Sequence, residues 1–497
     1  MTANLLPAWE SSSYFDHQEV GIEWMLSMEQ GYSVPDKPIT IRGGILGDKP
    51  GVGKTIQALG LIANGAIGKT LIVTPLTVKK QWEDELIRAN VNLYTPQEWG
   101  SKWVIQTNKL SQNSVYLAHY DKIANKPLLT KLQHFDRIII DEAHTIRNSK
   151  TKKCQAILSI DAKYKWALTG TPIINSFSDA LTYLKFIGYP VAGNAWLPEH
   201  TACIKQVYMS RTRHECEAPP GLVMPPQEME QTLLMEFTDP QEELVYSTIL
   251  KNEEAQWRKA SARGDKLEMF AIYMRLRQVS INPQIYTNAR GAETAGWTGP
   301  VFSGPSKKFM ELSHLMRDAQ EAKEQHRWIV FCQFHSEMDL LKTFLKALSF
   351  VGSVLEYHGG MSIHQRNATI KQSKDISLDL QDVFLIQLQA GSTGLNLQHY
   401  DRVVFMSPWW TPSEMEQAIH RAVRIGQTKV VKIYNLVLNA ENIFNIDAFM
   451  LSKVSEKKNI AQEFESWSFH RNKNLINLTL DQNGPEDECC TPTYSTC

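Results

Sequence analysis

The stretch GGILGDKPGVGKTIQALGLI, residues 43–62, places a short apolar run before a glycine-rich turn and a run of helical periodicity after it. A strand, such a turn and a helix in this order form the phosphate-binding loop of parallel α/β sheets. Gly51 and Gly53 let main-chain N–H groups approach phosphate oxygens, and the following helix points its positive end at the anion. Lys54 can reach the β- and γ-phosphates, and Thr55 can bind Mg²⁺. The stretch predicts an α/β sheet that binds a nucleotide.

The turn departs from the general pattern at one position, because Asp48 stands where glycine is usual. Taken alone, a Gly-x-Gly-Lys-Thr turn leaves an ordinary strand-to-helix connection open as the alternative. The candidate nucleotide-binding residues in this turn are Asp48, Lys49, Pro50, Gly51, Val52, Gly53, Lys54 and Thr55.

A second polar site follows the apolar run at residues 137–140, which ends in Asp141, Glu142, Ala143 and His144. Carboxylates at the carboxyl end of a parallel strand lie where ligands bind in such sheets. We expect Asp141 to hold Mg²⁺ and Glu142 to polarise the attacking water, because phosphoryl transfer depends on positioning and charge neutralisation. The alternative is that the two carboxylates only complement the dipole of a helix start. A phosphate loop in the same lobe favours the nucleotide site.

Apolar runs of strand length form two clusters, one before about residue 190 and one after about residue 325, and they alternate with stretches of helical period. This rhythm predicts two α/β lobes with parallel sheets. Residues 236–280 contain no strand-like run and are rich in helix formers, which predicts a helical insertion. Repeated Pro, Gly and Thr in residues 282–306 predict a connecting loop. The predicted parts are a first lobe at 1–222, the insertion and linker at 223–306, a second lobe at 307–470 and a disordered tail at 471–497.

The composition is that of a folded globular chain, with 497 residues, 43% of them hydrophobic and 21% charged. The net charge of -1 means that any binding to nucleic acid must come from a local patch. Seven cysteines without a C-x-x-C pair favour a reducing interior and predict no structural zinc. No run of about 18 apolar residues and no signal-peptide pattern occur, so we expect an intracellular protein that does not span a membrane.

The segment SPWWTPSEMEQAIHRAVRIGQ, residues 407–427, predicts a helix in the second lobe. Thr411 can cap this helix, with Pro412 in the first position and Glu414 completing a capping box. Gly426 would end the helix. Trp409 and Trp410 could stack on a base, but tryptophans at a strand end belong more often to the core.

Three polar residues of this predicted helix, Gln417, Arg421 and Arg424, are spaced by four and then three positions and would share one face. Two guanidinium groups on one face can neutralise the charge that develops on a transferring phosphoryl group. The alternative is a basic stripe exposed to solvent. These three residues are our candidates for the second half of the catalytic site.

In this order the motifs resemble those of the superfamily 2 helicase-like motors and, within them, the Swi/Snf-type DNA-dependent ATPases. The resemblance covers residues 14–440. Its segments are FDHQEVGIEWM, GDKPGVGKT, LIVTPLTVKKQWEDEL, VYLAHYDKI, DEAH and LTGTPIINS, followed by RWIVFCQF, YHGGMS, QAGSTGLNL and QAIHRAVRIGQ. The segments MSRTRHECEAPPGLVMPPQ, LRQVSINP and SPWWTPSEMEQAIHR resemble features particular to the Swi/Snf type.

The resemblance implies two tandem RecA-like lobes that hydrolyse ATP with Mg²⁺ and a motor that tracks along double-stranded DNA through its phosphate backbone without separating the strands. A DNA-bound protein would be displaced or remodelled. By the same resemblance Gln18 contacts adenine, Gly394 belongs to the nucleotide site, Arg421 and Arg424 are the arginine fingers, and Thr169, Gly170 and Thr171 couple the phosphates to DNA. The candidate DNA contacts are Thr74, Lys79, Lys80, Arg147, Lys150, Gly359, Gly360, Ser392 and Thr393.

Some positions depart from the family pattern. Lys49 and Pro50 replace the usual Glu and Met, His420 replaces an Asp, and Val423 replaces a His. Because the phosphate loop and both fingers are intact, we expect ATPase activity. No Cys/His cluster of RING type occurs, and such a bare motor resembles minimal members, including those of large DNA viruses.

Other functions remain open from the sequence. One alternative is an RNA or DNA helicase that separates strands, and another is a viral transcription-associated nucleoside triphosphatase. A catalytically silent scaffold is a third, although it would not need Lys54, Glu142 and both arginines. We expect the protein in the nucleus or at a site of DNA replication and transcription, or in a virion or viral factory if it is viral.

Overall fold

The computed structural model describes residues 14–89, 91–98, 100–107, 113–212, 215–216, 226–293, 301–375, 379–391, 395–424, 426–439 and 444–469. The chain forms two compact units, and each is described by itself. The first unit is Met1–Glu217 together with Asn459–Cys497, and the second is Ala218–Lys458.

The first unit is built on an eight-stranded sheet with the strand order β10-β3-β9-β8-β4-β7-β5-β6. The strands are parallel except for β6, which runs antiparallel to β5. Their bounds are β3 Gly43–Leu46, β4 Lys69–Thr74, β5 Asn92–Pro96, β6 Trp103–Thr107, β7 Ser114–His119, β8 Arg137–Asp141, β9 Tyr164–Leu168 and β10 Tyr208–Met209. The central strands are almost entirely buried, as expected for a sheet covered on both faces.

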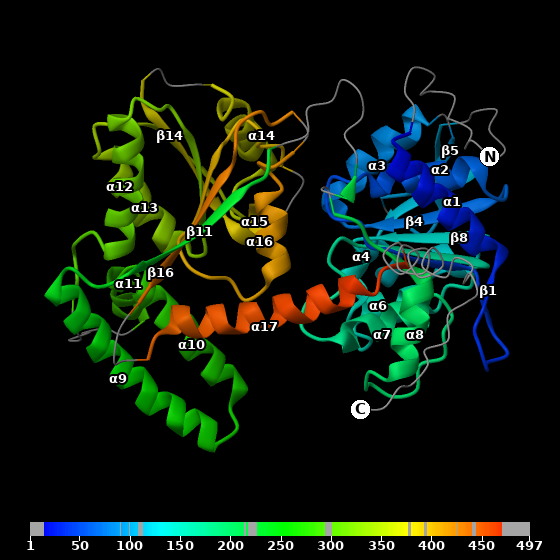
Figure 1. The fold of residues 1–497 in the computed structure, drawn as a ribbon, viewed down its shortest axis with the longest axis horizontal. Helices are drawn as coiled ribbons and strands as arrows, with labels where there is room; N and C mark the ends of the chain where they lie inside the picture. Colours follow the sequence, from blue (N-terminus) through cyan, green and yellow to red (C-terminus); the bar gives the residue numbers. More distant parts are fainter. Residues whose placement is uncertain are drawn as a thin grey trace, which may run out of the picture. The chain divides into compact units, whose positions relative to one another are not determined.

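Helices cover both faces of this sheet (Figure 1), with α1 to α3 on one side and α4 and α6 to α8 on the other. Their bounds are α1 Asp16–Gln30, α2 Lys54–Asn64, α3 Leu76–Arg88, α4 Tyr120–Asn125, α5 Leu128–Lys131, α6 Lys152–Leu158, α7 Leu181–Phe186 and α8 Pro198–Val207. A buried ion pair ties α1 to β8, because Arg137 donates from Nε and Nη2 to Glu29 at 2.6 Å each. The hairpin β1 Tyr32–Ser33 and β2 Thr40–Ile41 follows α1.

The second unit contains a fully parallel six-stranded sheet with the order β11-β16-β15-β12-β14-β13. The bounds are β11 Met229–Met235, β12 Arg327–Cys332, β13 Val351–Tyr357, β14 Gln381–Gln387, β15 Arg402–Phe405 and β16 Lys432–Leu438. Alternate residues of β12 enter two separate cores: Trp328 and Val330 pack under α12 and α13, and Ile329 packs on the side of α16. The predicted parallel α/β lobes are therefore confirmed.

The remaining helices of the second unit include the predicted insertion, which is confirmed as α9 Pro240–Ala262 and α10 Lys266–Ile281. Helix α11 Pro283–Glu293 falls where we expected a loop, so that prediction is wrong. The Asn282 side chain accepts from Gln284 N at 2.9 Å, and Pro283 is favourable in a first helical position. The other helices are α12 Lys307–Glu321, α13 His335–Lys346, α14 Ile363–Gln372, α15 Leu388–Gly391 and α16 Pro412–Ile419.

The last helix, α17 Ile446–Ser466, begins in the second unit, and its turns from Asn459 onward belong to the first. At its start the buried Asp447 accepts from Lys308 Nζ at 2.5 Å. Nothing in the local sequence indicates that the end of this helix belongs to the first unit, and the predicted bounds of the lobes stay a prediction. The predicted tail at 471–497 lies outside the described residues. Within the described ranges, no helix is long and apolar enough to cross a membrane.

Candidate nucleotide site

The glycine-rich turn joins β3 to α2, and two of its glycines have left-handed backbone conformations. The φ angles are 87° at Gly51 and 97° at Gly53, a region that glycine adopts without the penalty paid by other residues. A Cβ atom added at Gly53 would lie 2.4 Å from the Gln18 amide nitrogen, so a side chain there would displace Gln18. Helix α2 begins at Lys54 and directs its N-terminal N–H groups into the turn.

The buried side chain of Asp48 stabilises this turn through hydrogen bonds to residues outside it. Its carboxylate is completely buried and accepts from Arg211 Nη2 at 2.6 Å, from Arg211 Nε at 3.1 Å and from Gln57 Nε2 at 2.9 Å. Its carbonyl accepts from Lys54 Nζ at 2.6 Å. Only the main chain of Asp48 is therefore available to a nucleotide. The hydrogen bonds of its carboxylate explain why an aspartate is stable where the general pattern has glycine.

Gln18, the candidate adenine contact, lies against the turn and is 5% exposed. Its Oε1 accepts from Phe15 N at 3.3 Å, and its Nε2 is 3.5 Å from Val52 O. The ring of His17 is 3.0 Å from the same carbonyl through Nε2. Burial lowers the pKa of His17, which favours the neutral ring with a proton on Nε2. Helix α1 is therefore joined to the phosphate loop.

The two candidate carboxylates lie at the carboxyl end of β8. Asp141 accepts from Trp82 Nε1 at 2.7 Å and from Glu142 N at 2.9 Å. Burial, and next the charge of Glu142, raise the pKa of Asp141 to about 6. Glu142 has a φ of 49°, a left-handed conformation that costs energy for a residue with a side chain and that occurs preferentially at functional sites. Its carboxylate is 3.3 Å from His144 Nδ1.

The segment Thr169–Thr171 lies between these two motifs. A Cβ atom at Gly170 would be 2.9 Å from the Pro50 ring and 3.4 Å from Lys54 Nζ, so this glycine packs directly on the phosphate loop. Thr171 Oγ1 is 3.4 Å from His144 Nδ1, and Thr171 N donates to Thr169 Oγ1 at 3.2 Å. The segment therefore contacts both the loop and the acidic motif.

The first unit thus brings Gln18, the turn at residues 48–55, the acidic pair and the segment Thr169–Thr171 into one region. The donor set fits Mg²⁺, which usually takes one or two carboxylates and keeps waters and phosphates as its other ligands. Asp141 and the Thr55 hydroxyl are the protein groups that would hold it. The part of the chain that is described contains no group of three or more His, Cys, Asp and Glu that could hold a metal ion. The expectation of no structural zinc stays a prediction.

In the second unit the helix that was to present the arginine stripe is shorter than predicted. Helix α16 ends at Ile419, and Arg421 and Arg424 lie in the turns that follow, where Arg421 N donates to Ala418 O at 3.1 Å. The prediction that Gln417, Arg421 and Arg424 share one helical face is therefore wrong. The three residues remain close in sequence around the end of the helix. Arg424 Nε donates to His420 O at 3.0 Å, and burial lowers the pKa of Arg424.

The start of α16 also differs from the prediction. Pro412 is in the first turn as expected, but the Thr411 side chain makes no capping hydrogen bond. Glu414 instead accepts from Trp409 Nε1 at 2.7 Å, so the capping box is wrong. The indole donor of a buried tryptophan needs a partner, and Glu414 supplies it.

Arg277 of α10 fixes the segment that leads into α16. It is fully buried, donates from Nη2 to Pro408 O at 3.0 Å and lies 5.0 Å from the centre of the Trp409 ring. Burial lowers the pKa of Arg277 to about 10. Trp409 and Trp410 are thus packed with this arginine, as the core alternative had predicted. The helical insertion holds the strand-to-helix turn that precedes the arginines.

The candidate DNA contacts of the first unit differ in exposure. Thr74 is completely buried, while Arg147 and Lys150 are exposed. Lys79 is hydrogen-bonded to Glu83, and Lys80 is 3.0 Å from Asp84. The burial of Thr74 leaves its side chain out of reach of a ligand in this conformation. Arg147 and Lys150 are the best-placed cations of this set.

Two candidates of the second unit, Gly359 and Gly360, form an exposed turn after β13. Gly359 N donates to Gln387 Oε1 at 3.0 Å, and its carbonyl accepts from Arg366 Nη2 at 2.7 Å. Ser392 and Thr393, together with the nucleotide candidate Gly394, lie outside the described residues.

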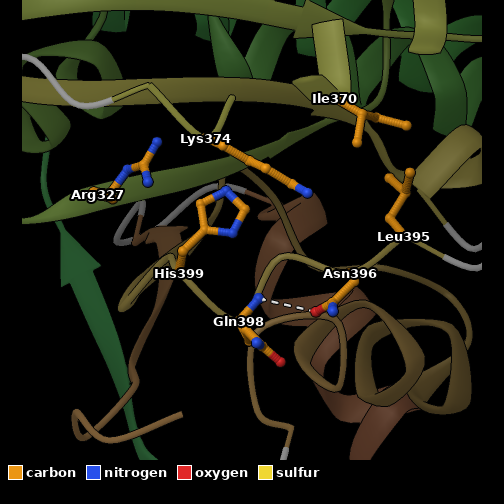
Figure 2. Close-up of a pocket in the computed structure, with 7 residues that line it drawn as sticks. All are labelled: Arg327, Ile370, Lys374, Leu395, Asn396, Gln398 and His399. Atoms are coloured by element: carbon orange, nitrogen blue, oxygen red, sulfur yellow. Dashed lines mark hydrogen bonds between the residues drawn. The ribbon is translucent and has the colours of Figure 1, made fainter. Parts of the chain in front are cut away.

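A cavity of about 510 Å³ lies in the second unit, near the amino end of β12 (Figure 2). It is lined by Arg327, Ile370, Lys374, Leu395, Asn396, Gln398 and His399. His399 Nε2 donates to Ser373 O at 2.9 Å, and burial, followed by the charge of Arg327, lowers the pKa of His399 to about 4. None of the candidate site residues that the structure describes is among those lining residues.

Sequence reasoning missed Trp82, Arg211 and Arg277, which support the predicted side chains. Arg211 falls in the basic segment quoted for the family resemblance, and Arg277 falls in its LRQVSINP segment. Trp82 falls in the quoted LIVTPLTVKKQWEDEL segment, but its helix has an ordinary amphipathic pattern, so no local signal pointed to its contact with Asp141.

A parallel-sheet lobe with a phosphate loop and a strand-end Asp-Glu pair, joined to a second parallel-sheet lobe with an arginine turn, defines a helicase-like ATPase core. Comparison with known families agrees: the SNF2-related domain matches residues 17–285, and the helicase conserved C-terminal domain matches residues 307–426. The first match covers more than half of the chain, and the chain belongs to the SNF2-related family of ATPases.

Similar proteins include the probable global transactivator of Orgyia pseudotsugata multicapsid polyhedrosis virus, which is 27% identical over 91% of both chains. The DNA repair protein RAD5 of Eremothecium gossypii is 24% identical over 86% of this chain and 57% of its own. The ISWI chromatin-remodeling complex ATPase ISW2 of Saccharomyces cerevisiae is 24% identical over 91% of this chain and 41% of its own. The chain therefore spans about half the length of these two cellular relatives.

Among solved structures, the Sulfolobus solfataricus SWI2/SNF2 ATPase core in complex with dsDNA is 21% identical, with 94% of this chain and 96% of that chain covered and a TM-score of 0.37.

Proposed function

We propose that this SNF2-family ATPase is a translocase of double-stranded DNA that uses ATP hydrolysis to move along the phosphate backbone and to displace or remodel bound proteins. One observation supports this most directly: the segment Thr169–Thr171 packs on Lys54 through Gly170 and reaches His144 through Thr171. The exposed cations Arg147 and Lys150 follow His144 within six residues. Hydrolysis of the bound nucleotide would therefore change contacts that lead to the exposed cations Arg147 and Lys150, which are suited to bind DNA phosphates.

The proposed division of labour follows from the side chains. Lys54 binds the terminal phosphates, and Glu142 accepts a proton from the attacking water. Asp141 and Thr55 hold Mg²⁺, which neutralises the phosphate oxygens when bound. Arg421 and Arg424 stabilise the charge on the transferring group, and Gln417 orients them or the water.

Recognition of DNA would depend on phosphate contacts and would be insensitive to sequence. Arg147 and Lys150 offer such contacts from the first unit, and the Gly359–Gly360 turn offers main-chain groups from the second. The names of the relatives include DNA repair and chromatin-remodeling proteins and a viral transactivator. They support an activity on DNA, in the nucleus or in a viral factory.

The decisive experiment titrates ATP hydrolysis with duplex DNA, single-stranded DNA and RNA of equal length. We expect duplex DNA to stimulate turnover most, and we expect the protein to displace the third strand of a triplex in an ATP-dependent manner. Equal stimulation by RNA, or unwinding of a forked duplex without triplex displacement, would contradict the proposal.

The DNA surface is tested by replacing Arg147 and Lys150 together by alanine. Each lost phosphate contact should reduce the slope of log binding constant against log salt by about 0.9, so the double variant should lose roughly 2. Lys163→Ala is the matched control, because Lys163 is exposed but precedes the amino end of β9. An unchanged slope in the double variant would exclude this surface.

A further inference from the structure

The end of α17 is built into the core of the first unit beside the phosphate loop. Phe464 is completely buried and packs on Tyr208, with ring centres 5.0 Å apart. Trp467 stacks on Trp196, with ring centres 5.9 Å apart and an interplanar angle of 15°. These contacts hold the last turn of α17 in one place and orientation.

Hydrogen bonds of two serine side chains and of the main chain continue from this helix end to the loop. Ser468 Oγ accepts from Ser210 N at 2.8 Å and donates to Ser210 O at 3.0 Å. Ser210 Oγ donates to Gly47 O at 3.0 Å, and Lys49 N donates to Arg211 O at 3.0 Å. Ser210 and Arg211, which directly follow β10, therefore connect the end of α17 to the first residues of the phosphate loop.

A direct ion pair adds to this connection. Glu465 Oε1 lies 2.6 Å from Lys49 Nζ, and the two side chains are 13% and 19% exposed. A pair that is mostly shielded from water is screened less than a surface pair and fixes its partners more firmly.

Lys49 begins the turn that presents N–H groups to phosphate, because its carbonyl accepts from Val52 N at 3.2 Å. We infer that Glu465 is a positioning residue for ATP binding, which acts through Lys49 to hold the phosphate loop in its binding conformation. A loop ordered before binding loses less conformational freedom when the nucleotide arrives. The contribution should therefore appear in the affinity for ATP and not in the chemical step.

This inference rests on the phosphate loop being the ATP site, and the experiment separates the two. In the full chain, Glu465→Gln should raise KM for ATP about fivefold and change kcat less than twofold, as expected for one partly shielded ion pair. The thermal midpoint of the nucleotide-free protein should stay within about 2 °C. If Glu465 were only structural, Glu465→Gln would lower the thermal midpoint and leave KM for ATP of the folded enzyme unchanged. That result would overturn the inference.

A charge swap gives the second readout. Lys49→Glu should raise KM as Glu465→Gln does, and the double variant with Lys49→Glu and Glu465→Lys should recover KM to within about twofold of the wild type, because the pair is restored in reverse. Glu463→Gln is the control, since Glu463 is exposed on the same helix two residues earlier. A double variant as impaired as the two single changes combined would overturn the inference. A wild type that does not bind ATP at Lys54 would instead refute the site itself.

Discussion

The two units contain the two halves of the proposed machinery, but they hold their side chains differently. In the first unit, residues from distant parts of the chain fix the site: Trp82 holds Asp141, and Arg211 holds Asp48. In the second unit, Arg424 is held by the carbonyl of His420, four residues earlier in its own turn. The first site is therefore fixed by tertiary contacts, and the second depends more on a local turn.

This difference in support explains which half of the site could be recognised from the sequence. The phosphate loop and the acidic pair could be recognised because they keep the local sequence patterns of their elements, although long-range partners fix their side chains. The arginine turn lacks the regular helix that its spacing suggested, because the backbone turns after Ile419. Arg277 holds only the segment that leads into α16.

The largest effect should come from Glu142→Gln, which tests whether the first site performs the chemistry. Without a carboxylate to accept the proton, kcat should fall about 10³-fold, while ATP binding stays within about twofold. Steady-state hydrolysis and the binding of a fluorescent nucleotide measure the two quantities. Glu199→Gln, an exposed carboxylate on α8, should leave both unchanged. If Glu142→Gln hydrolysed ATP at the wild-type rate, the general base would have to be another residue.

A smaller loss, about 10²-fold in kcat, should follow Arg424→Lys, which tests the turn of the second unit. Lysine keeps the charge but has no Nε donor for the His420 carbonyl and no planar fork for phosphate. Single-turnover hydrolysis would show the loss in the chemical step. A fully active lysine variant would mean that Arg424 acts only as a surface charge.

The tertiary support of the first site can be broken with Arg211→Met. Removing one partner of a buried ion pair leaves the carboxylate of Asp48 uncompensated, so the free energy of unfolding should fall by about 3 kcal/mol. The first transition in urea, followed by tryptophan fluorescence, measures this. Lys80→Ala, which removes an exposed pair with Asp84, should leave that transition in place. Equal midpoints for Arg211→Met and wild type would contradict the role of the pair.

The mildest effect concerns pH. Because the pKa of Asp141 is raised to about 6, this carboxyl gains a proton as pH falls through that value and then competes with Mg²⁺. The Mg²⁺ concentration for half-maximal turnover should rise about tenfold per pH unit below 6 and be constant above 7. Trp82→Phe removes a hydrogen bond that lowers this pKa, so it should shift the rise to higher pH. A flat profile in both proteins would exclude Asp141 as a ligand.

Much of the fold followed from local pattern, because the apolar runs at residues 71–73, 137–140 and 383–386 are the centres of β4, β8 and β14. The phosphate loop was predictable for the same reason. The end of α16 was not, since after Ile419 the backbone turns and Leu397 N donates to Arg421 O, a contact that no sequence spacing reveals. Equally hidden were Trp82–Asp141 and Arg211–Asp48, whose partners are 59 and 163 residues apart.

The packing of Phe464 and Ser468 has a consequence for synthesis on the ribosome. Ser210 and Ser468 are 258 residues apart, so the first lobe emerges long before the segment that completes its core. At about 5 to 20 residues per second, translation leaves this gap open for roughly 13 to 50 seconds. During that time the rings of Tyr208, Trp196 and Phe177 lack their final cover, and a nascent chain interrupted before residue 464 would expose an aromatic surface to chaperones.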